Sequence, residues 1–132
     1  MNRGVRPIRR RWGCLAAFVL AATAINARAD VVDIAWDATG RFETLLSVAP
    51  DKFAEVCGRL MQGQSIAWSF TADKPTNFNI HYHAGKQLVF PAKQDGVSQV
   101  EGLLKVSLVQ DYCWMWTNKA SGAVVLNASF QR

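Results

Sequence analysis

"QSIAWSFTA" (residues 64–72) is the stretch that decides the fold class of this chain, because its large apolar side chains alternate with small or polar ones. Such a period of two residues is typical of a β-strand with one buried face. The stretch therefore predicts a strand whose inward side chains are Ile66, Trp68 and Phe70.

Similar strand signals recur on both sides of this stretch. They lie at residues 31–36, 41–48, 77–83 and 123–130. Turn-forming sequences separate them: Ala-Thr-Gly, Asp-Lys-Pro-Thr, Ala-Gly-Lys, Gln-Asp-Gly and Ala-Ser-Gly. Short strands with regular turns predict an all-β fold, a single antiparallel β-sandwich.

One segment does not follow the strand pattern. PDKFAEVCGRLMQG (50–63) spaces its apolar residues as in a helix and places Gly63 beyond the last of them. We expect one short helix near 51–61, with a strand as the alternative.

The first 29 residues have the features of an export signal. A basic start, MNRGVRPIRRR, precedes the apolar run CLAAFVLAATAI, which is too short to span a bilayer permanently. Ala27 and Ala29 supply the small residues that a signal peptidase recognises. We expect cleavage of this signal peptide (1–29) after Ala29 and one domain (30–132), secreted or periplasmic and not membrane-spanning. Arg9-Arg10 leaves both the general and the twin-arginine export routes open.

The positive net charge of +5 comes from this leader. The leader holds six of the fifteen Lys and Arg residues and none of the ten acidic ones, so residues 30–132 carry a net charge near −1. No basic cluster remains there, and this argues against a nucleic-acid partner.

Two cysteines remain after the leader, Cys57 and Cys113. An even number in a small exported domain predicts a disulfide between them. Thiolate ligands or a reactive cysteine are the alternative.

The two histidines of the chain lie one residue apart in FNIHYHAGK (78–86). On a strand both point to the same face, close enough to hold one copper or zinc ion. The other interpretation is a solvated polar face. Two imidazoles alone bind weakly, so we expect further ligands from a neighbouring strand. The candidate metal ligands are His81, His83, Met115 and Asp111.

Another aromatic-rich stretch is DYCWMWTN (111–118). The expected disulfide favours Cys113 and Met115 as its inward face, which puts the aromatic side chains on the opposite face. There they are either covered by VSQVEGLLKV (97–106) or exposed for a partner. The candidate binding surface is Tyr112, Trp114 and Trp116.

Three motifs together carry a resemblance to a known group. QGQSIAWSF (62–70), FNIHYH (78–83) and YCWMWTN (112–118) resemble small exported bacterial proteins of uncharacterised function. More distantly, they are similar to the Golgi-dynamics (GOLD) β-sandwich of eukaryotic cargo receptors, in which a cysteine shortly before an aromatic-x-Asn turn is bridged to an earlier one. Trp116-Thr-Asn118 fits that turn, and Cys113 lies two residues earlier than that pattern has it. The resemblance implies a strand over residues 51–60 and recognition of protein or lipid, with no known enzymatic activity.

These observations predict an exported binding module that is not an enzyme. We expect its partner to be a protein, a lipid or a small ligand, and we expect no cofactor. No nucleophile motif such as G-x-S-x-G accompanies the histidines, and acid–base catalysis would also need a pocket. The alternative is a periplasmic copper- or zinc-binding protein that uses His81 and His83.

Overall fold

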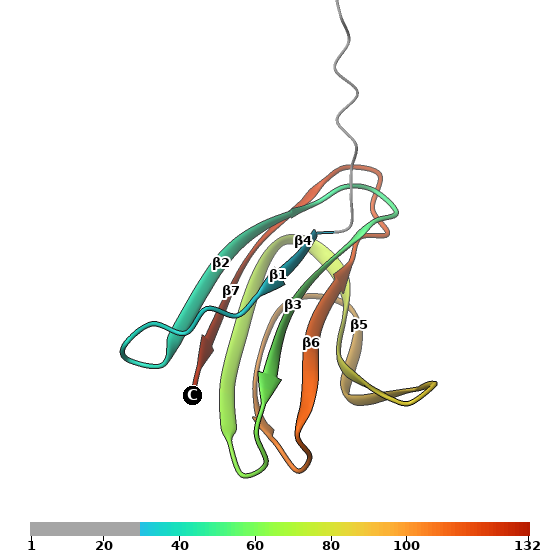
Figure 1. Ribbon diagram of the computed structural model, residues 1–132. Helices are drawn as coiled ribbons and strands as arrows, with labels where there is room; N and C mark the ends of the chain where they lie inside the picture. Colours follow the sequence, from blue (N-terminus) through green and yellow to red (C-terminus); the bar gives the residue numbers. More distant parts are fainter. Residues whose placement is uncertain (1–29) are drawn as a thin grey trace, which may run out of the picture.

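The computed structural model describes residues 30–132, and these form seven β-strands and no helix (Figure 1). The expected signal peptide lies outside the described residues. The strands are β1 (Asp30–Asp33), β2 (Arg41–Val48), β3 (Phe53–Leu60), β4 (Ser65–Ala84), β5 (Gln87–Lys105), β6 (Gln110–Thr117) and β7 (Val124–Gln131). The predicted all-β fold is confirmed.

Strand β4 joins the two layers of the sandwich. Its first half, Ala67–Ala72, pairs with β7, and its second half, Asn77–His81, pairs with β6. β5 runs beside β4 along nearly its whole length. One layer therefore contains β2, β7 and the first half of β4, and the other contains β1, β3, β6 and the second half (Figure 1). All pairings are antiparallel except that of β1 with β3.

Two of the expected turns are bends inside long strands. The sequence predicts separate strands at 64–72 and 77–83, but β4 is one strand of 20 residues with register shifts between Thr71 and Phe78. Pro75 has no N–H to donate to the sheet, and Gly96 opposite this bend has a φ of 67°. Proline and glycine therefore interrupt the ladder here without ending either strand.

The expected helix near 51–61 is wrong, because this segment contains strand β3. Ala54, Val56 and Leu60 point into the core, while Cys57 points to the opposite face. Strand β3 lies between β1 and β6 and bonds to both. Pairing on both edges thus outweighs the local helical spacing of its apolar residues.

The core lies between the two layers. The predicted inward residues Ile66, Trp68 and Phe70 are buried. The ring of Trp116 on β6 packs edge-on against Phe70 of the other layer, with centroids 5.5 Å apart. Trp114 contacts Phe130 of β7 in the same way at 5.1 Å. Aromatic contacts between the layers therefore hold the sandwich together.

The expectation that the aromatic face of 111–118 is a binding surface is wrong. Tyr112, Trp114 and Trp116 are 2%, 0% and 1% exposed, whereas Cys113 and Met115 lie half-buried on the outer face. Three large rings remove far more apolar area from water than a cysteine and a methionine do. That difference turns the aromatic residues inward and leaves the disulfide outside.

Candidate functional site

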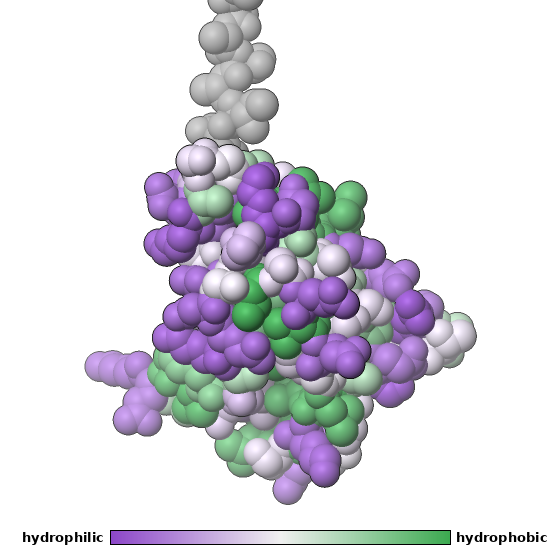
Figure 2. Space-filling model, turned by 180° about the vertical axis from the view of Figure 1, so that it is seen from behind, coloured by the Kyte–Doolittle hydropathy of each residue, from purple (hydrophilic) through white to green (hydrophobic). Residues whose placement is uncertain are grey.

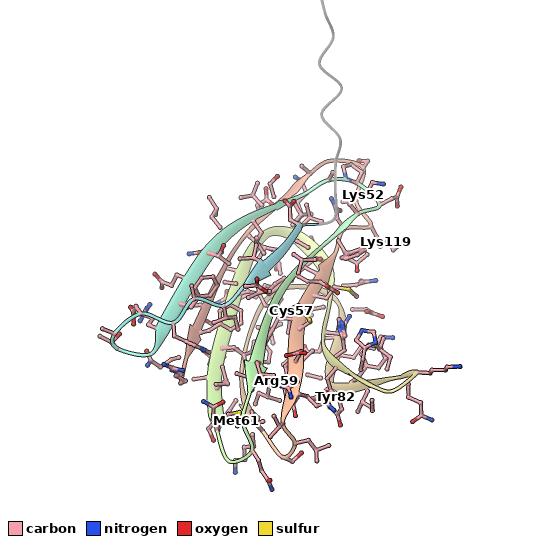
Figure 3. All side chains as sticks on the ribbon, viewed as in Figure 1. Lys52, Cys57, Arg59, Met61, Tyr82 and Lys119 are labelled. Carbon is pink, nitrogen blue, oxygen red and sulfur yellow. A yellow bond between two sulfur atoms is a disulfide. The ribbon has the colours of Figure 1, made fainter. Side chains whose placement is uncertain are left out.

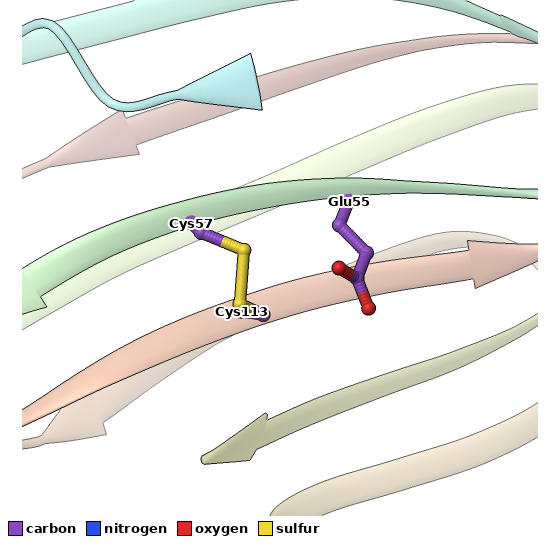
Figure 4. Close-up of side chains that lie close together, drawn as sticks. All are labelled: Glu55, Cys57 and Cys113. Atoms are coloured by element: carbon purple, nitrogen blue, oxygen red, sulfur yellow. A yellow bond between two sulfur atoms is a disulfide. The ribbon is translucent and has the colours of Figure 1, made fainter. Parts of the chain in front are cut away.

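The disulfide between Cys57 and Cys113 is present, as predicted, and it marks the outer face of the β3–β6 pair. The two cysteines lie directly opposite each other in the antiparallel register. In Figure 4 the Glu55 side chain, which starts from β3, extends to the same side as the disulfide bond. Figure 3 shows Cys57 and Arg59 following one another along the same strand.

The histidines lie on this same outer face. His81 is opposite Cys113 in the register of β4 and β6, and the rings of His81 and His83 are 5.7 Å apart. His83 is exposed, as a solvated strand face requires. His81 and Asn79 are only 4% and 7% exposed, so this part of the outer face is covered.

His81 and two side chains beside it form a polar cluster, defined here as Glu55, Asn79 and His81. Nδ1 of His81 lies 2.8 Å from Oδ1 of Asn79, and Nε2 lies 3.6 Å from Oε1 of Glu55. An amide oxygen only accepts hydrogen bonds, so Nδ1 donates to it. In the neutral ring, Nε2 therefore directs its lone pair toward Glu55.

Burial shifts both titratable groups of this cluster toward their neutral forms. It raises the pKa of Glu55 above its usual value, and the charge of His83 opposes that shift. Burial also lowers the pKa of His81, and His83 acts in the same direction. Both shifts favour the uncharged forms and so weaken the charge attraction between Glu55 and His81.

The structure does not join all four expected metal ligands. Asp111 is exposed, and its carboxylate contacts Nη1 of Arg59 at 3.5 Å. Met115 lies opposite Asn79 and lines a hollow together with Phe90. Of the four expected ligands, the histidines and Met115 lie at or beside the polar cluster, since Met115 is opposite both Glu55 and Asn79, whereas Asp111 lies apart from it.

Glu55 is the residue that sequence reasoning missed. It lies 26 positions before His81 and carries no local motif. Its position opposite Met115, and hence diagonal to His81 across β6, follows from the registers of two strand pairs. Among the described residues, a group with metal-ligand atoms mutually within 4.8 Å consists of Glu55, Cys57 and Cys113, but both cysteines are in the disulfide.

A second candidate site is a shallow groove on the outer face of the other layer. It has a volume of about 540 Å³ and lies over β4, β5 and β7. Small outward residues such as Ala67, Ser69 and Ser129 form its floor, and Leu103 on β5 is 57% exposed beside it. On the side seen in Figure 2, apolar patches lie among hydrophilic residues.

Large apolar side chains are also exposed at one end of the sandwich. Met61, in the β3–β4 turn, is 54% exposed, and Leu108, in the β5–β6 connection, is 51% exposed. The two connections are joined by a hydrogen bond from the N–H of Gly63 to the carbonyl of Val106. Figure 3 shows Met61 at the opposite end of the molecule from Lys52 and Lys119. Within residues 30–132, no helix has the length and apolar character needed to cross a membrane.

Comparisons with known proteins show the fold. No family model and no curated relative matches this chain. PliG of Aeromonas hydrophila, a periplasmic lysozyme inhibitor of g-type lysozyme, is similar in structure with a TM-score of 0.63 and 15% identity, over 79% of this chain and 96% of that one. PliG of Salmonella Typhimurium, also a periplasmic inhibitor of g-type lysozyme, has a TM-score of 0.54 and 9% identity, over 79% and 98% of the chains.

A third similar structure belongs to a larger enzyme. The pre-peptidase C-terminal domain of collagenase from Bacillus anthracis has a TM-score of 0.57 and 11% identity, over 79% of this chain and 95% of that domain. At such low identities the likeness concerns the β-fold alone.

Proposed function

We propose that this protein is an exported, periplasmic binding module without enzymatic activity, and that its partner is a protein. The observation that carries the proposal is the groove over β4, β5 and β7, beside which Leu103 is 57% exposed. A partner that covers this leucine and the groove removes apolar surface from water, and this favours binding.

Two further observations support a protein as the partner. The PliG structures share the fold over 79% of this chain, and both are inhibitors of an enzyme, g-type lysozyme. The resemblance to the GOLD domain also implies recognition of protein or lipid. A g-type lysozyme is therefore the first specific partner to test.

Photo-crosslinking in the host tests the proposal. A photoreactive residue replaces Leu103 beside the groove, and the matched control replaces Lys86, which is exposed in the β4–β5 turn. We expect one discrete protein adduct from position 103 and none from position 86. The same probe is also placed at Leu45 of β2 and at Leu108, which are 71% and 51% exposed. Absence of a protein adduct from all three positions, 103, 45 and 108, would contradict a protein partner and favour a lipid or a small ligand.

A second experiment identifies the partner. Increasing amounts of the purified protein are added to a g-type lysozyme, and hydrolysis of peptidoglycan is measured. Stoichiometric inhibition, weakened by Leu103→Asp, is expected if this enzyme is the partner. Undiminished hydrolysis together with a discrete adduct from position 103 would assign the groove to a different protein.

A further inference from the structure

Nε2 of His81 has no hydrogen-bond partner among the residues that the structure describes. The side chains of His81 and Glu55 are 5% and 16% exposed, and Nε2 of His81 lies 3.6 Å from Oε1 of Glu55. This distance exceeds that of a hydrogen bond. Among the described residues, Nε2 forms no hydrogen bond, because the one hydrogen bond of this ring is made by Nδ1. Within residues 30–132, the fully buried side-chain atoms without a partner are Nε1 of Trp114 and Nε1 of Trp116. Nε2 of His81 is not one of them, so it keeps some contact with solvent and an ion can reach it.

Asn79 prepares Nε2 for such a ligand. Its Oδ1 accepts a hydrogen bond from Nδ1 of His81, which sets the tautomer and the ring orientation. Histidines that bind metal ions nearly always donate their other N–H to an oxygen in this way. Asn79 is 7% exposed, so water competes little for this hydrogen bond.

The distance between Nε2 and the carboxylate fits one metal ion. Two ligands at 2.0–2.1 Å from a tetrahedral ion lie about 3.3 Å apart. The observed 3.6 Å needs only a small adjustment of either side chain. The ring of His83 is exposed and lies 5.7 Å from that of His81. The ligand atoms of Glu55, His81 and His83 do not all lie within 4.8 Å of one another, so a change of the His83 rotamer is needed to bring its ring nitrogen to the same ion.

We propose that Glu55, His81 and His83 bind one divalent transition-metal ion of the Cu²⁺ or Zn²⁺ class, with Asn79 as a positioning residue. Two imidazoles and one carboxylate suit both ions. The ligand set differs from the one expected from sequence, because Glu55 takes the place of Asp111 and Met115. The sulfur atoms of Cys57 and Cys113 are joined to each other and are not thiolate ligands.

Calorimetric titration with Cu²⁺ and with Zn²⁺ tests this site. The protein is expressed with its own leader and purified without reductant. We expect micromolar or tighter one-to-one binding of at least one of the two ions. Glu55→Gln should lower the affinity about tenfold or more, and Asn79→Ala about 10- to 100-fold. His83→Ala should weaken binding without unfolding the domain, because this side chain is exposed.

A matched control separates the two ligand sets. Asp111→Asn keeps the size of the side chain and, because Asp111 lies apart from the polar cluster, should bind the ion as the unchanged protein does. Circular dichroism confirms that each variant is folded, and electron paramagnetic resonance of the Cu²⁺ form should show two coordinated nitrogens that fall to one in His83→Ala.

Four results would overturn the site. They are absence of micromolar binding of either ion, unchanged binding by Glu55→Gln, loss of binding in Asp111→Asn, and binding that arises only after the disulfide is reduced. The last result would assign the ion to Cys57 and Cys113.

Discussion

The side-chain amide of Asn118 donates a hydrogen bond to the backbone carbonyl of Val48, 2.8 Å away, and so joins the end of β6 to the end of β2. The same nitrogen donates to the carbonyl of Gly122 at 2.8 Å, and Oδ1 accepts from the N–H of Ala120 at 2.7 Å. Asn118 is fully buried. It therefore ties the two layers together at one end of the sandwich.

Asn118→Ala should destabilise the protein by about 3 kcal/mol, since three hydrogen bonds contribute about 1 kcal/mol each. Asn118→Asp should be at least as harmful, because its carboxylate would face two carbonyl oxygens. Chemical denaturation measures both, with Asn127→Ala on the exposed face of β7 as the control. A loss below about 1 kcal/mol in Asn118→Ala would contradict this role.

The disulfide should contribute about 4 kcal/mol to the free energy of unfolding. Cys57 and Cys113 are 56 positions apart. In the chain-entropy model, closing a loop of this length lowers the entropy of the unfolded chain and so raises the free energy of unfolding by about 4 kcal/mol. The double variant Cys57→Ala/Cys113→Ala, compared with the parent by chemical denaturation, measures the effect. Reductant should lower the stability of the parent and leave that of the variant unchanged. Equal stabilities of the two proteins would argue against the bridge.

Trp116→Ala should destabilise the fold by about 3–5 kcal/mol, as truncation of a buried aromatic residue does. Its ring contacts Phe70 and Phe78, so the cavity would open in the centre of the core. Trp116→Phe keeps one ring and should cost less. Thermal unfolding of the two variants, followed by near-ultraviolet circular dichroism, measures both losses of stability. A Trp116→Ala variant as stable as the parent would restore this side chain as a surface residue.

Asp37 should make stability depend on pH in strongly acidic solution. Its Oδ1 accepts hydrogen bonds from the N–H groups of Arg41 and Thr39 and from the Thr39 hydroxyl. The hydrogen bond from the Arg41 N–H, followed by that from the Thr39 hydroxyl, lowers the pKa of Asp37 below 3.8. Because the folded pKa is depressed, the stabilisation is complete above pH 3.8 and is lost as the pH falls through the folded pKa.

The melting temperatures of the parent and of Asp37→Ala, compared between pH 5 and pH 2, measure this dependence. The difference between the two melting temperatures should be constant near pH 5 and should become smaller as the pH falls toward 2. A difference that widens toward pH 2 would contradict the sign of the pKa shift.

The candidate site could be predicted only in part. That His81 and His83 share a face follows from the two-residue period of any strand. That Asn79 and His81 are buried, and that Glu55 reaches Nε2, depends on which strands lie beside β4 and in which register. These residues are far apart in the sequence, so no local sequence pattern predicts that they come into contact.

The sequence by itself determined the fold class and the inward residues of several strands. Ile66, Trp68 and Phe70 are buried as predicted, because alternation decides which side chains share a face wherever a strand lies. Only the tertiary structure decided that residues 53–60 form a strand and that Trp114 and Trp116 turn inward. Both outcomes depend on partners: hydrogen bonds from β1 and β6 in the first case, and aromatic rings of the opposite layer in the second. These partners are brought together only when the chain folds.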